Sequence, residues 1–359
     1  MTFIKRATVI IFILTIIASA SVAFWVYRDL HLPQIHSHSQ EYIQIQRGAP
    51  PKEIVSKLES LGVIRRSWTL SLYLKLTGRT SKLKAGDYRF PSPITPLEVV
   101  KKLEEGEERF VRFTVIEGWT RWDIAAKMVE IPELKLKNQE EALVLMNDTS
   151  KIKDIDPRAE NLEGYLYPDT YNFPLDVTPK QIIDTMVERF RKVWKPEWIN
   201  RAKELNKTPR EIVTLASLIE TEAKLSEERP VISSVIYNRL KINMNLGVDS
   251  AVIYASKLAG KWRNNGKVYK SDLERNSPYN TRIYPGLPPG PIASASSSSL
   301  QAALFPAETK YLYYVREPSR NDGAHNFYDN ATDFERGVKA LRDWERERDA
   351  QENYSKSQS

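Results

Sequence analysis

The sequence predicts an α+β protein in three parts: an N-terminal transmembrane helix, a small α+β module and a larger helix-rich α+β domain. Three observations support this prediction. A long charge-free apolar run stands near the N-terminus, a strand–glycine–helix pattern occurs twice at an offset of 70 positions (113 − 43), and 359 residues are too many for one small core. With 41% hydrophobic and 28% charged residues, the composition is that of a globular protein and argues against wholesale disorder.

The apolar run extends from Ala7 to Tyr27 and contains no charged residue. As a helix it would span roughly 31 Å at about 1.5 Å per residue, which matches the hydrocarbon core of a bilayer. Because Lys5 and Arg6 precede it, the positive-inside rule places residues 1–6 in the cytoplasm and exports the rest. We therefore predict a single-pass protein of the cytoplasmic (inner) membrane whose bulk is periplasmic or otherwise extracytoplasmic. The alternative is a cleaved signal peptide, since Ala18-Ser19-Ala20 resembles a cleavage site, but the apolar run continues past it.

Residues 28–40 are interpreted as a polar linker, with three solvated histidines rather than a metal site. Residues 41–110 follow as a compact module. The module begins with the strand–glycine–helix pattern from Ile43, and the second copy, from Phe113, opens the next domain. Between the two copies the sequence predicts helices over 68–77 and 96–105, and a turn into a strand at Lys84-Ala-Gly-Asp-Tyr88.

Residues 111–348 form the larger predicted domain, and residues 349–359 a polar tail. One segment of this domain, 161–171, is too interrupted by Gly and Pro for a helix. Its three tyrosines stand beside Glu163 and Asp169, and rings beside carboxylates can stack on a sugar and bind its hydroxyls. The same composition fits a loop packed on a core, and this second interpretation is favoured from the segment alone.

The residues from Thr208 to Ala223 predict a helix that begins at a good N-cap, with Pro209 first and Glu211 third. Glu220 falls in the last turn, on or beside the apolar stripe. Burial disfavours the charged form of a carboxylate, and so does the negative end of the helix dipole. An acid that stays protonated near neutral pH can donate its proton to a glycosidic oxygen. Glu222 points about 200° away around a straight helix, so the two carboxylates do not form a tight pair.

Other segments offer weaker candidates. Asp249 is interpreted as the N-cap of a short helix. The stretch 277–292, rich in Pro and Gly, predicts a stiff extended loop that either lines a groove for a long polymer or connects two elements. The serine run 294–299 could supply a nucleophile, but no His or other general base lies at a spacing typical of nucleophilic catalysis. The run is therefore interpreted as the N-cap region of a helix. His325 is interpreted as a structural residue in preference to a proton shuttle.

The composition excludes several classes of site. The chain has no Cys, which rules out disulfides, thiolate nucleophiles and Cys-based metal centres, and it has only four His. Since it also has no phosphate loop or dinucleotide fingerprint, we predict an activity without cofactor or metal. An excess of 53 basic over 46 acidic residues, a net charge of +7, suits an anionic polymer or a membrane surface. Without a dense basic stripe, however, we predict no binding to nucleic acid.

Together, the ordered motifs of the chain resemble those of the endolytic murein transglycosylases, the YceG-like family. The resemblance covers residues 1 to about 340, in the order membrane anchor, LysM-like module and catalytic domain. Six or seven motifs in one order are far more specific than any single motif. The matching segments are Lys84-Ala-Gly-Asp-Tyr88, Glu117-Gly118, Leu162 to Tyr171, Leu215 to Glu222, Val235 to Leu240, Val248 to Tyr254, and Tyr279 to Ile292.

The resemblance implies roles for individual residues. The catalytic Glu of the family is the first of a Glu-x-Glu pair and corresponds to Glu220, and the second corresponds to Glu222. Thr221 stands where the family often has Lys, and Ser250 where it commonly has Pro; neither change removes a carboxylate. The residues implied in glycan binding are Glu222, Glu163, Asn238, Asp249, Asn280, Gly286, Leu287 and Pro288.

For the activity, the resemblance implies non-hydrolytic cleavage of the β-1,4 bond between N-acetylmuramic acid (MurNAc) and N-acetylglucosamine (GlcNAc) in peptidoglycan. The products would carry 1,6-anhydroMurNAc ends, with Glu220 as general acid and then general base. The resemblance also implies glycan binding by residues 41–110, action on nascent glycan strands and an association with peptidoglycan synthases. Two alternatives stay open: a muramidase-type hydrolase, and a membrane-anchored peptidoglycan-binding scaffold without catalysis.

Overall fold

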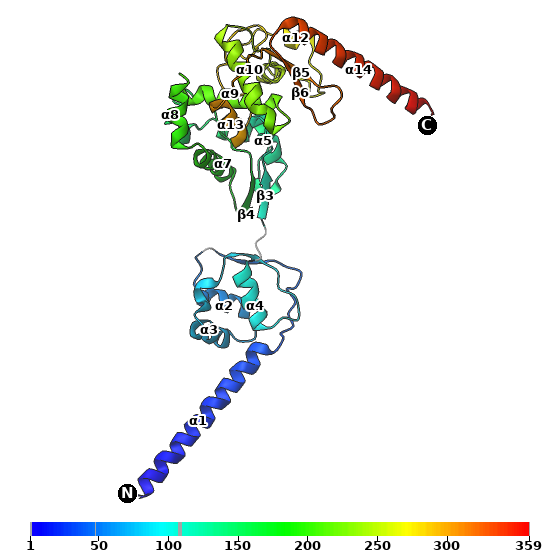
Figure 1. Cartoon of the computed structure of the whole chain (residues 1–359). Coiled ribbons are helices and arrows are strands. Elements are labelled where there is room, and N and C mark those ends of the chain that lie inside the picture. Colours follow the sequence, from blue (N-terminus) through cyan, green and yellow to red (C-terminus); the bar gives the residue numbers. More distant parts are fainter. Residues whose placement is uncertain (1, 47, 107–109, 359) are drawn as a thin grey trace. The chain divides into compact units, whose positions relative to one another are not determined.

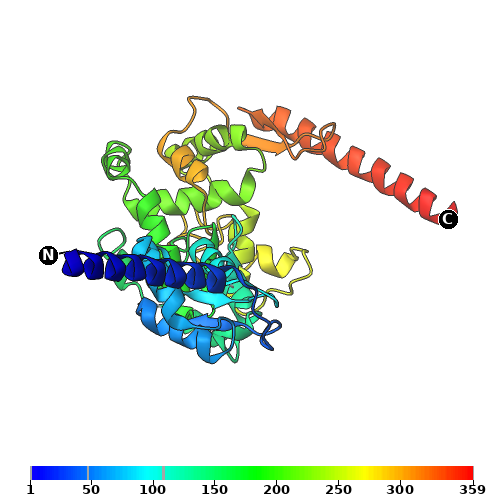
Figure 2. The ribbon, with the colours of Figure 1, turned by 90° about the horizontal axis from the view of Figure 1, so that it is seen from below.

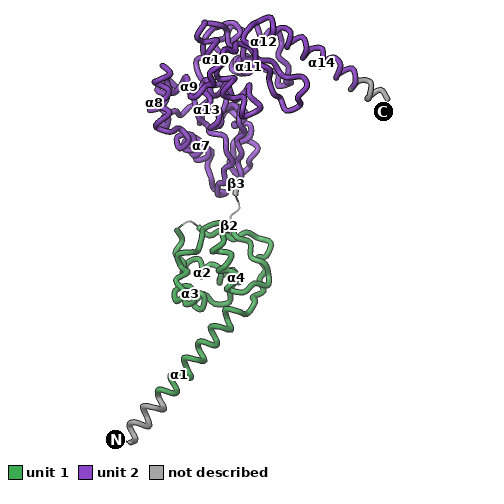
Figure 3. Tube along the Cα trace, in the orientation of Figure 1, with its two compact units in different colours: residues 1–111 green, residues 112–359 purple. Residues whose placement is uncertain are grey.

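The computed structural model describes the backbone of residues 2–46, 48–106 and 110–358, and the side chains of 12–46, 48–106 and 111–351. The chain divides into two compact units, residues 1–111 and residues 112–359 (Figure 3). Helices dominate, and the strands form small two-stranded sheets. The predicted α+β class is therefore confirmed at this coarse level.

The first unit opens with one long helix, α1 (Thr2–His31) (Figure 1). The part of α1 whose side chains are described, Phe12–His31, is long and apolar enough to cross a membrane, and only 11% of it is buried inside the protein. The side chains of Lys5 and Arg6, on which the predicted orientation depends, lie outside the described residues. The other elements of this unit are β1 (Ile43–Ile45), α2 (Pro51–Ser60), α3 (Ser67–Leu76), β2 (Gly86–Tyr88) and α4 (Pro96–Glu105).

The core of the first unit lies between its short sheet and its helices. β1 and β2 pair antiparallel with Ile43 opposite Tyr88, and both of these side chains are buried. The two predicted helices correspond to α3 and α4. For α4 the predicted limits are confirmed because its ends are marked by strong signals: a reciprocal cap with Thr95 at the N-terminus and Gly106, with φ at +80°, at the C-terminus.

Residues 28–40 differ from the solvated linker that the sequence predicted. α1 continues through His31, and Leu30 belongs to the core of the unit. Asp29 is buried and accepts hydrogen bonds from Arg66 at 2.9 Å and from the Thr69 hydroxyl at 2.7 Å. These partners lie 37 and 40 positions away in the sequence, so the local polar composition alone could not reveal them.

The second unit is built around α9 (Pro209–Glu222), whose residues from Ile212 to Glu220 are all buried. β3 pairs with β4, and β5 pairs antiparallel with β6. The segment 161–171 is a turn that leads into β4, with Tyr165 and Leu166 buried, which confirms the core-packed interpretation. The other elements are β3 (Phe110–Thr114), α5 (Arg121–Val129), α6 (Gln139–Leu145), β4 (Thr170–Pro174), α7 (Pro179–Val193), α8 (Pro196–Glu204), α10 (Arg229–Lys241), α11 (Asp249–Leu258), α12 (Lys270–Leu273), α13 (Ser297–Leu304), β5 (Tyr313–Arg316), β6 (His325–Tyr328) and α14 (Ala331–Gln358).

The C-terminal helix α14 extends away from the rest of the second unit in both views (Figure 1, Figure 2). It continues to Gln358, through residues that the sequence predicted as a polar tail. Ala350, Gln351, Glu352, Lys356 and Gln358 are good helix formers, so α14 can continue through this mostly polar segment.

Candidate active site

Glu220 lies in the last turn of α9, at the centre of the second unit. The helix begins with a reciprocal cap: Thr208 Oγ1 accepts from the Glu211 N–H at 3.2 Å, and Glu211 Oε2 accepts from the Thr208 N–H at 2.8 Å. This cap and Pro209 start the helix where the sequence predicted. Only 3% of the Glu220 side chain is exposed, which confirms that it lies on the buried face.

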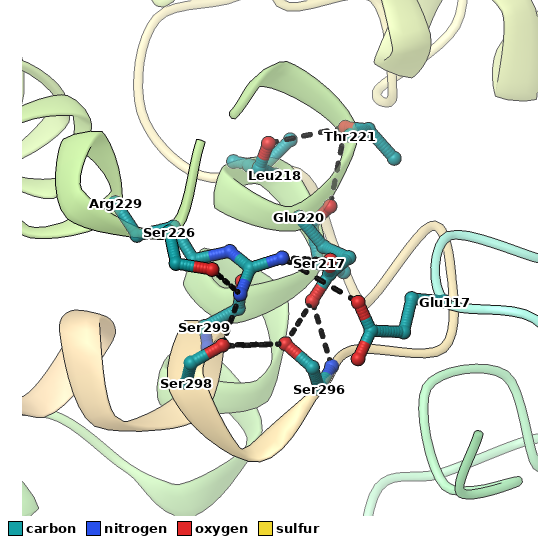
Figure 4. Close-up of polar contacts among 10 residues, drawn as sticks. All are labelled: Glu117, Ser217, Leu218, Glu220, Thr221, Ser226, Arg229, Ser296, Ser298 and Ser299. Atoms are coloured by element: carbon teal, nitrogen blue, oxygen red, sulfur yellow. Dashed lines mark hydrogen bonds and ion pairs between the residues drawn. The ribbon is translucent and has the colours of Figure 1, made fainter. Parts of the chain in front are cut away.

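Both oxygens of the Glu220 carboxylate accept hydrogen bonds (Figure 4). Arg229 Nη2 donates to Oε1 at 2.9 Å. The backbone N–H of Ser296 donates to Oε2 at 2.7 Å, and the Ser296 hydroxyl donates to the same oxygen. These donors favour a carboxylate held in one orientation, because each oxygen is fixed by a group on a different segment of the chain.

Arg229 links this carboxylate to a second one. It is the first residue of α10, and 9% of its side chain is exposed. Its Nη2 also lies 3.5 Å from Oε2 of Glu117, and its Nη1 donates to the hydroxyl of Ser298. Two carboxylates therefore share one guanidinium, which compensates part of the cost of burying the charge of Glu220.

Glu117 lies in the turn between β3 and α5 and is the more open of the two acids, with 54% of its side chain exposed. Burial and the negative charge of Glu220 raise the pKa of Glu117, whereas Arg229 opposes the rise. The turn is held in place by two backbone hydrogen bonds, from Gly118 to Ser294 and back from Ser294 to Trp119, each 2.8 Å long. These bonds help to hold Glu117 beside Arg229, the guanidinium that it shares with Glu220.

Glu222 faces a different set of partners from Glu220. It accepts a hydrogen bond from the Tyr314 hydroxyl at 2.8 Å and from Ser250 at 3.4 Å. Burial raises the pKa of Glu222, and the Tyr314 hydrogen bond opposes the rise. The prediction that Glu220 and Glu222 do not form a tight pair agrees with these separate contacts.

Glu163 is buried at the N-terminus of α5, where both carboxylate oxygens accept from the Arg121 backbone N–H at 3.2–3.3 Å. Burial raises the pKa of Glu163 to about 7, and the Arg121 hydrogen bond opposes the rise. Among the described contacts, none joins Glu163 to Glu220. The arrangement ties the aromatic segment 161–171 to the start of α5.

Comparisons with known proteins identify the family of the chain. A family model described as the YceG-like family matches residues 43–340, which is most of the chain. This chain belongs to the YceG-like family.

Two relatives in this family are named endolytic murein transglycosylase. The protein of Bacillus subtilis is 34% identical over 292 residues, covering 76% of this chain and 78% of that protein. The protein of Streptococcus pneumoniae serotype 2 is 28% identical over 362 aligned positions, covering 93% of this chain and 65% of that protein. The chain thus spans slightly less than two thirds of the streptococcal relative.

A solved structure also matches this YceG-like chain. The crystal structure of a YceG-like protein from Listeria monocytogenes has a TM-score of 0.56 and 33% sequence identity, and the match covers 83% of this chain and 99% of that one. The identity is high enough to support kinship as well as a common fold.

The remaining predicted residues of this YceG-like chain have partners of their own. Asn280 is fully buried and donates to two backbone carbonyls, Leu273 O and Arg275 O. Asn238 likewise donates to the carbonyls of Thr309 and Tyr311. Both amides therefore fix the course of neighbouring loops.

Asp249 is the first residue of α11 rather than its N-cap, which is Val248. Its carboxylate instead pairs with Arg282 at 2.6 Å, because the loop before 286–288 folds back onto the start of this helix. In that loop Gly286 has φ at +88°, Leu287 is half-buried and Pro288 is buried.

The serine run contributes to the site in a way that the sequence did not predict. Ser296 is the N-cap of α13, as its composition suggested, and its hydroxyl accepts from the Ser299 N–H at 3.3 Å. The same residue donates to Glu220, 76 positions away. His325 pairs with Glu228 at 2.7 Å, in agreement with a structural role. Among the described residues, no group of three His, Asp or Glu side chains is arranged to hold a metal ion.

Proposed function

We propose that this protein is a lytic transglycosylase of peptidoglycan, cleaving the MurNAc–GlcNAc β-1,4 bond without water and leaving 1,6-anhydroMurNAc ends. The single observation with most weight is Glu220, a carboxyl group buried at the end of a core helix and oriented by Arg229 and Ser296. Membership of the YceG-like family and the names of the relatives support the same reaction.

The proposed chemistry needs one carboxyl group that works twice. Glu220 first gives its proton to the glycosidic oxygen, which leaves with GlcNAc as its bond to C1 of MurNAc breaks. The C6 hydroxyl oxygen of the same MurNAc then bonds to C1, and its proton passes to the Glu220 carboxylate. The acid is thereby restored and no water is consumed. Between the two steps, Arg229 and Ser296 stabilise the carboxylate that has formed.

For the glycan-binding residues we propose two kinds of contribution. Glu222 and the loop residues Gly286, Leu287 and Pro288 would line the path of the glycan. The contacts of Glu163, Asn238, Asp249 and Asn280 are with the protein itself, which supports a role in shaping that path.

We further propose that residues 41–110 form a LysM-like module that binds glycan strands. Its order of strand, two helices and strand, with the strands antiparallel, supports a self-contained module of this kind. Residues 7–27 would anchor the chain in the cytoplasmic membrane with its bulk outside, close to nascent strands and to the synthases that make them. The length and exposure of α1 support an anchor, and a signal sequence is the alternative.

A muramidase-type hydrolase is the second candidate, and one observation favours it. Glycoside hydrolysis usually needs two carboxyl groups, and Glu117 is a second acid at the same arginine as Glu220. In that reaction water would be the acceptor, and Glu117 or Glu220 would remove its proton. The products would be heavier by one water, about 18 Da per cut, than those of the non-hydrolytic reaction.

The test is mass spectrometry of the products formed from purified peptidoglycan. We expect the full chain to release anhydro-ended fragments and Glu220→Gln to release none, because the amide of Gln has no acidic proton to donate to the glycosidic oxygen. Glu197→Gln, an exposed change on α8, is the matched control and should behave as the wild type. Reducing-end products would favour the hydrolase. If Glu220→Gln still cleaved, the assignment of the catalytic group would be wrong, and binding without any product would favour a scaffold.

A further inference from the structure

We propose that α3 of the first unit lies in the surface of the phospholipid bilayer that α1 spans, as a second contact with the membrane that does not cross it. This inference rests on the proposed role of α1 as an anchor. It concerns the first unit alone and does not depend on the reaction at Glu220.

The first observation is an exposed apolar stripe on α3. Trp68, Leu72 and Leu76 follow one another at intervals of four residues, so they lie on one face of the helix. Their exposed fractions are 48%, 37% and 76%, whereas Leu70 and Leu74 on the opposite face are buried. Single exposed apolar residues are ordinary, but a stripe of three on one helix indicates a surface that meets an apolar partner.

The second observation is where this stripe lies. Trp68 stacks on Trp25 of α1, with ring centroids 5.3 Å apart and 13° between the planes. Further along α3, Leu72 and Leu76 line a groove of about 670 Å³ whose α1 wall extends from Ala18 to His31. The stripe of α3 therefore borders the apolar part of α1.

The shared groove indicates how deep the stripe lies. From Trp25 back to Ala18 the helix α1 extends by about 10 Å, at about 1.5 Å per residue. With the aromatic pair at the headgroup level, where Trp side chains are favoured, the groove that Leu72 and Leu76 line extends to the depth of the upper acyl chains. Interfacial helices bury their apolar face to about 5–10 Å, so the depths agree. The exposed Lys75 beside the stripe can extend its charged end back to the phosphates.

The third observation is that polar contacts join α1 to the start of α3. The buried Asp29 of α1 accepts hydrogen bonds from Arg66 and Thr69 at the start of α3. The Arg66 guanidinium also lies over the Trp25 ring, 4.5 Å from its centroid. An α1 helix that spans the bilayer therefore brings the stripe of α3 to the membrane surface, and lipid rather than glycan is the occupant of the groove.

The chain has no Cys, so single-cysteine variants can be labelled without background. We would label Leu72→Cys and Leu76→Cys of the full chain with an environment-sensitive fluorophore, in phosphatidylethanolamine–phosphatidylglycerol vesicles containing spin-labelled lipids. Ile16→Cys, in the apolar run of α1, reports the anchor. Gln44→Cys is the aqueous control: it is exposed on β1, which pairs with β2 at the end of the unit away from α1 (Figure 3).

We expect lipid quenchers to reduce fluorescence at 16, 72 and 76 at least threefold more than at 44. Quenching at 16 with 72 and 76 behaving like 44 would overturn the proposal while leaving the anchor intact. No quenching at 16 would overturn both. If soluble peptidoglycan fragments, rather than lipid, changed the signal at 72 and 76, the stripe would be a glycan site and the proposal would be wrong. None of these outcomes depends on cleavage activity.

Discussion

At the scale of single residues, the site depends on how charge is distributed around Glu220. The carboxylate shares the Arg229 guanidinium with Glu117, and the two acids differ in exposure: 3% of the Glu220 side chain is accessible against 54% for Glu117. In the proposed reaction the buried acid donates its proton to the glycosidic oxygen, and the half-exposed acid adds a pH-dependent charge beside the shared guanidinium. Burial and the negative charge of Glu220 raise the pKa of Glu117.

Glu117→Gln tests the role of this second acid through the pH dependence of cleavage. Burial and the charge of Glu220 raise the pKa of Glu117, so in the wild type its negative charge beside Arg229 appears as the pH rises through that raised pKa, and the variant lacks this titration. We therefore expect the cleavage rate of the variant to change less with pH than that of the wild type, with little difference between the two at pH values at which Glu117 is protonated. Initial rates between pH 5 and pH 9 compare the two profiles. A uniform loss at all pH values would contradict the electrostatic role, and Glu197→Gln controls for a general effect of removing a surface carboxylate.

Glu163 offers a test of stability rather than of rate. Its pKa in the folded protein is about 7 against a usual value of 4.5, so between these values the folded state binds more protons than the unfolded state. Stability from this group is therefore full below pH 4.5 and is lost as the pH rises through 7. In Glu163→Gln, which can still accept from the Arg121 N–H, we expect Tm to fall less from pH 5 to pH 8 than in the wild type. Thermal unfolding at both pH values measures this, and equal falls would be evidence against a buried, protonated Glu163.

At the scale of elements, α9 places the catalytic candidate, and its N-terminal cap fixes where the helix starts. We expect Thr208→Ala to cost about 1 kcal/mol of unfolding free energy, the usual value for a lost N-cap. For a unit of this size the cost corresponds to a fall in Tm of roughly 2–4 °C. Thr208→Ser keeps the hydroxyl and is the matched control. Thermal unfolding measures the difference, and an unchanged Tm in the alanine variant would mean that packing alone positions α9.

Elements with strong local signals could be predicted from the sequence, whereas those that depend on distant partners could not. α4 and α9 begin at Thr caps followed by Pro, and both start at the predicted residues. β4 was not predicted as a strand, since its pairing with β3 cannot be inferred from the Tyr-rich segment that precedes it. Residues 28–40 likewise adopt a defined structure through distant contacts. Asp29 bonds to Thr69 of α3, and the backbone of Gln34 bonds to that of Ile94.

In the candidate site, too, local features could be predicted from the sequence and distant partners could not. Burial of Glu220 could be predicted, because the apolar spacing of α9 is local. Its partners could not, since Ser296 lies 76 positions away and Arg229 belongs to the next helix. Glu117 appeared only as part of a family motif, and no spacing connects it with Arg229, 112 positions further on. Burial and the helix end could be anticipated for Glu220 from the sequence, whereas the Arg229 guanidinium beside its carboxylate could not.

At the scale of the whole molecule, the two units have separate cores, and the proposed function gives them separate roles. The core of the first unit consists of residues between Leu30 and Leu103. Every described contact of Glu220, Glu117 and Arg229 lies within residues 112–359. On the proposed function, the reaction chemistry belongs to the second unit, whereas the first unit would offer attachment, to the membrane through α1 and to the glycan through the proposed module.

This separation predicts the behaviour of a fragment that begins at residue 110 and so retains β3. We expect it to fold, to release the same products as the full chain from soluble glycan fragments, and to keep kcat within about twofold because all contacts of the acid are retained. On intact sacculi we expect a KM several-fold higher and weaker co-sedimentation, since the module that would hold the polymer is missing. Circular dichroism establishes folding before the kinetic comparison. A folded fragment without any activity on soluble glycan would mean that the first unit takes part in the reaction itself, and unchanged binding to sacculi would remove the proposed module from glycan recognition.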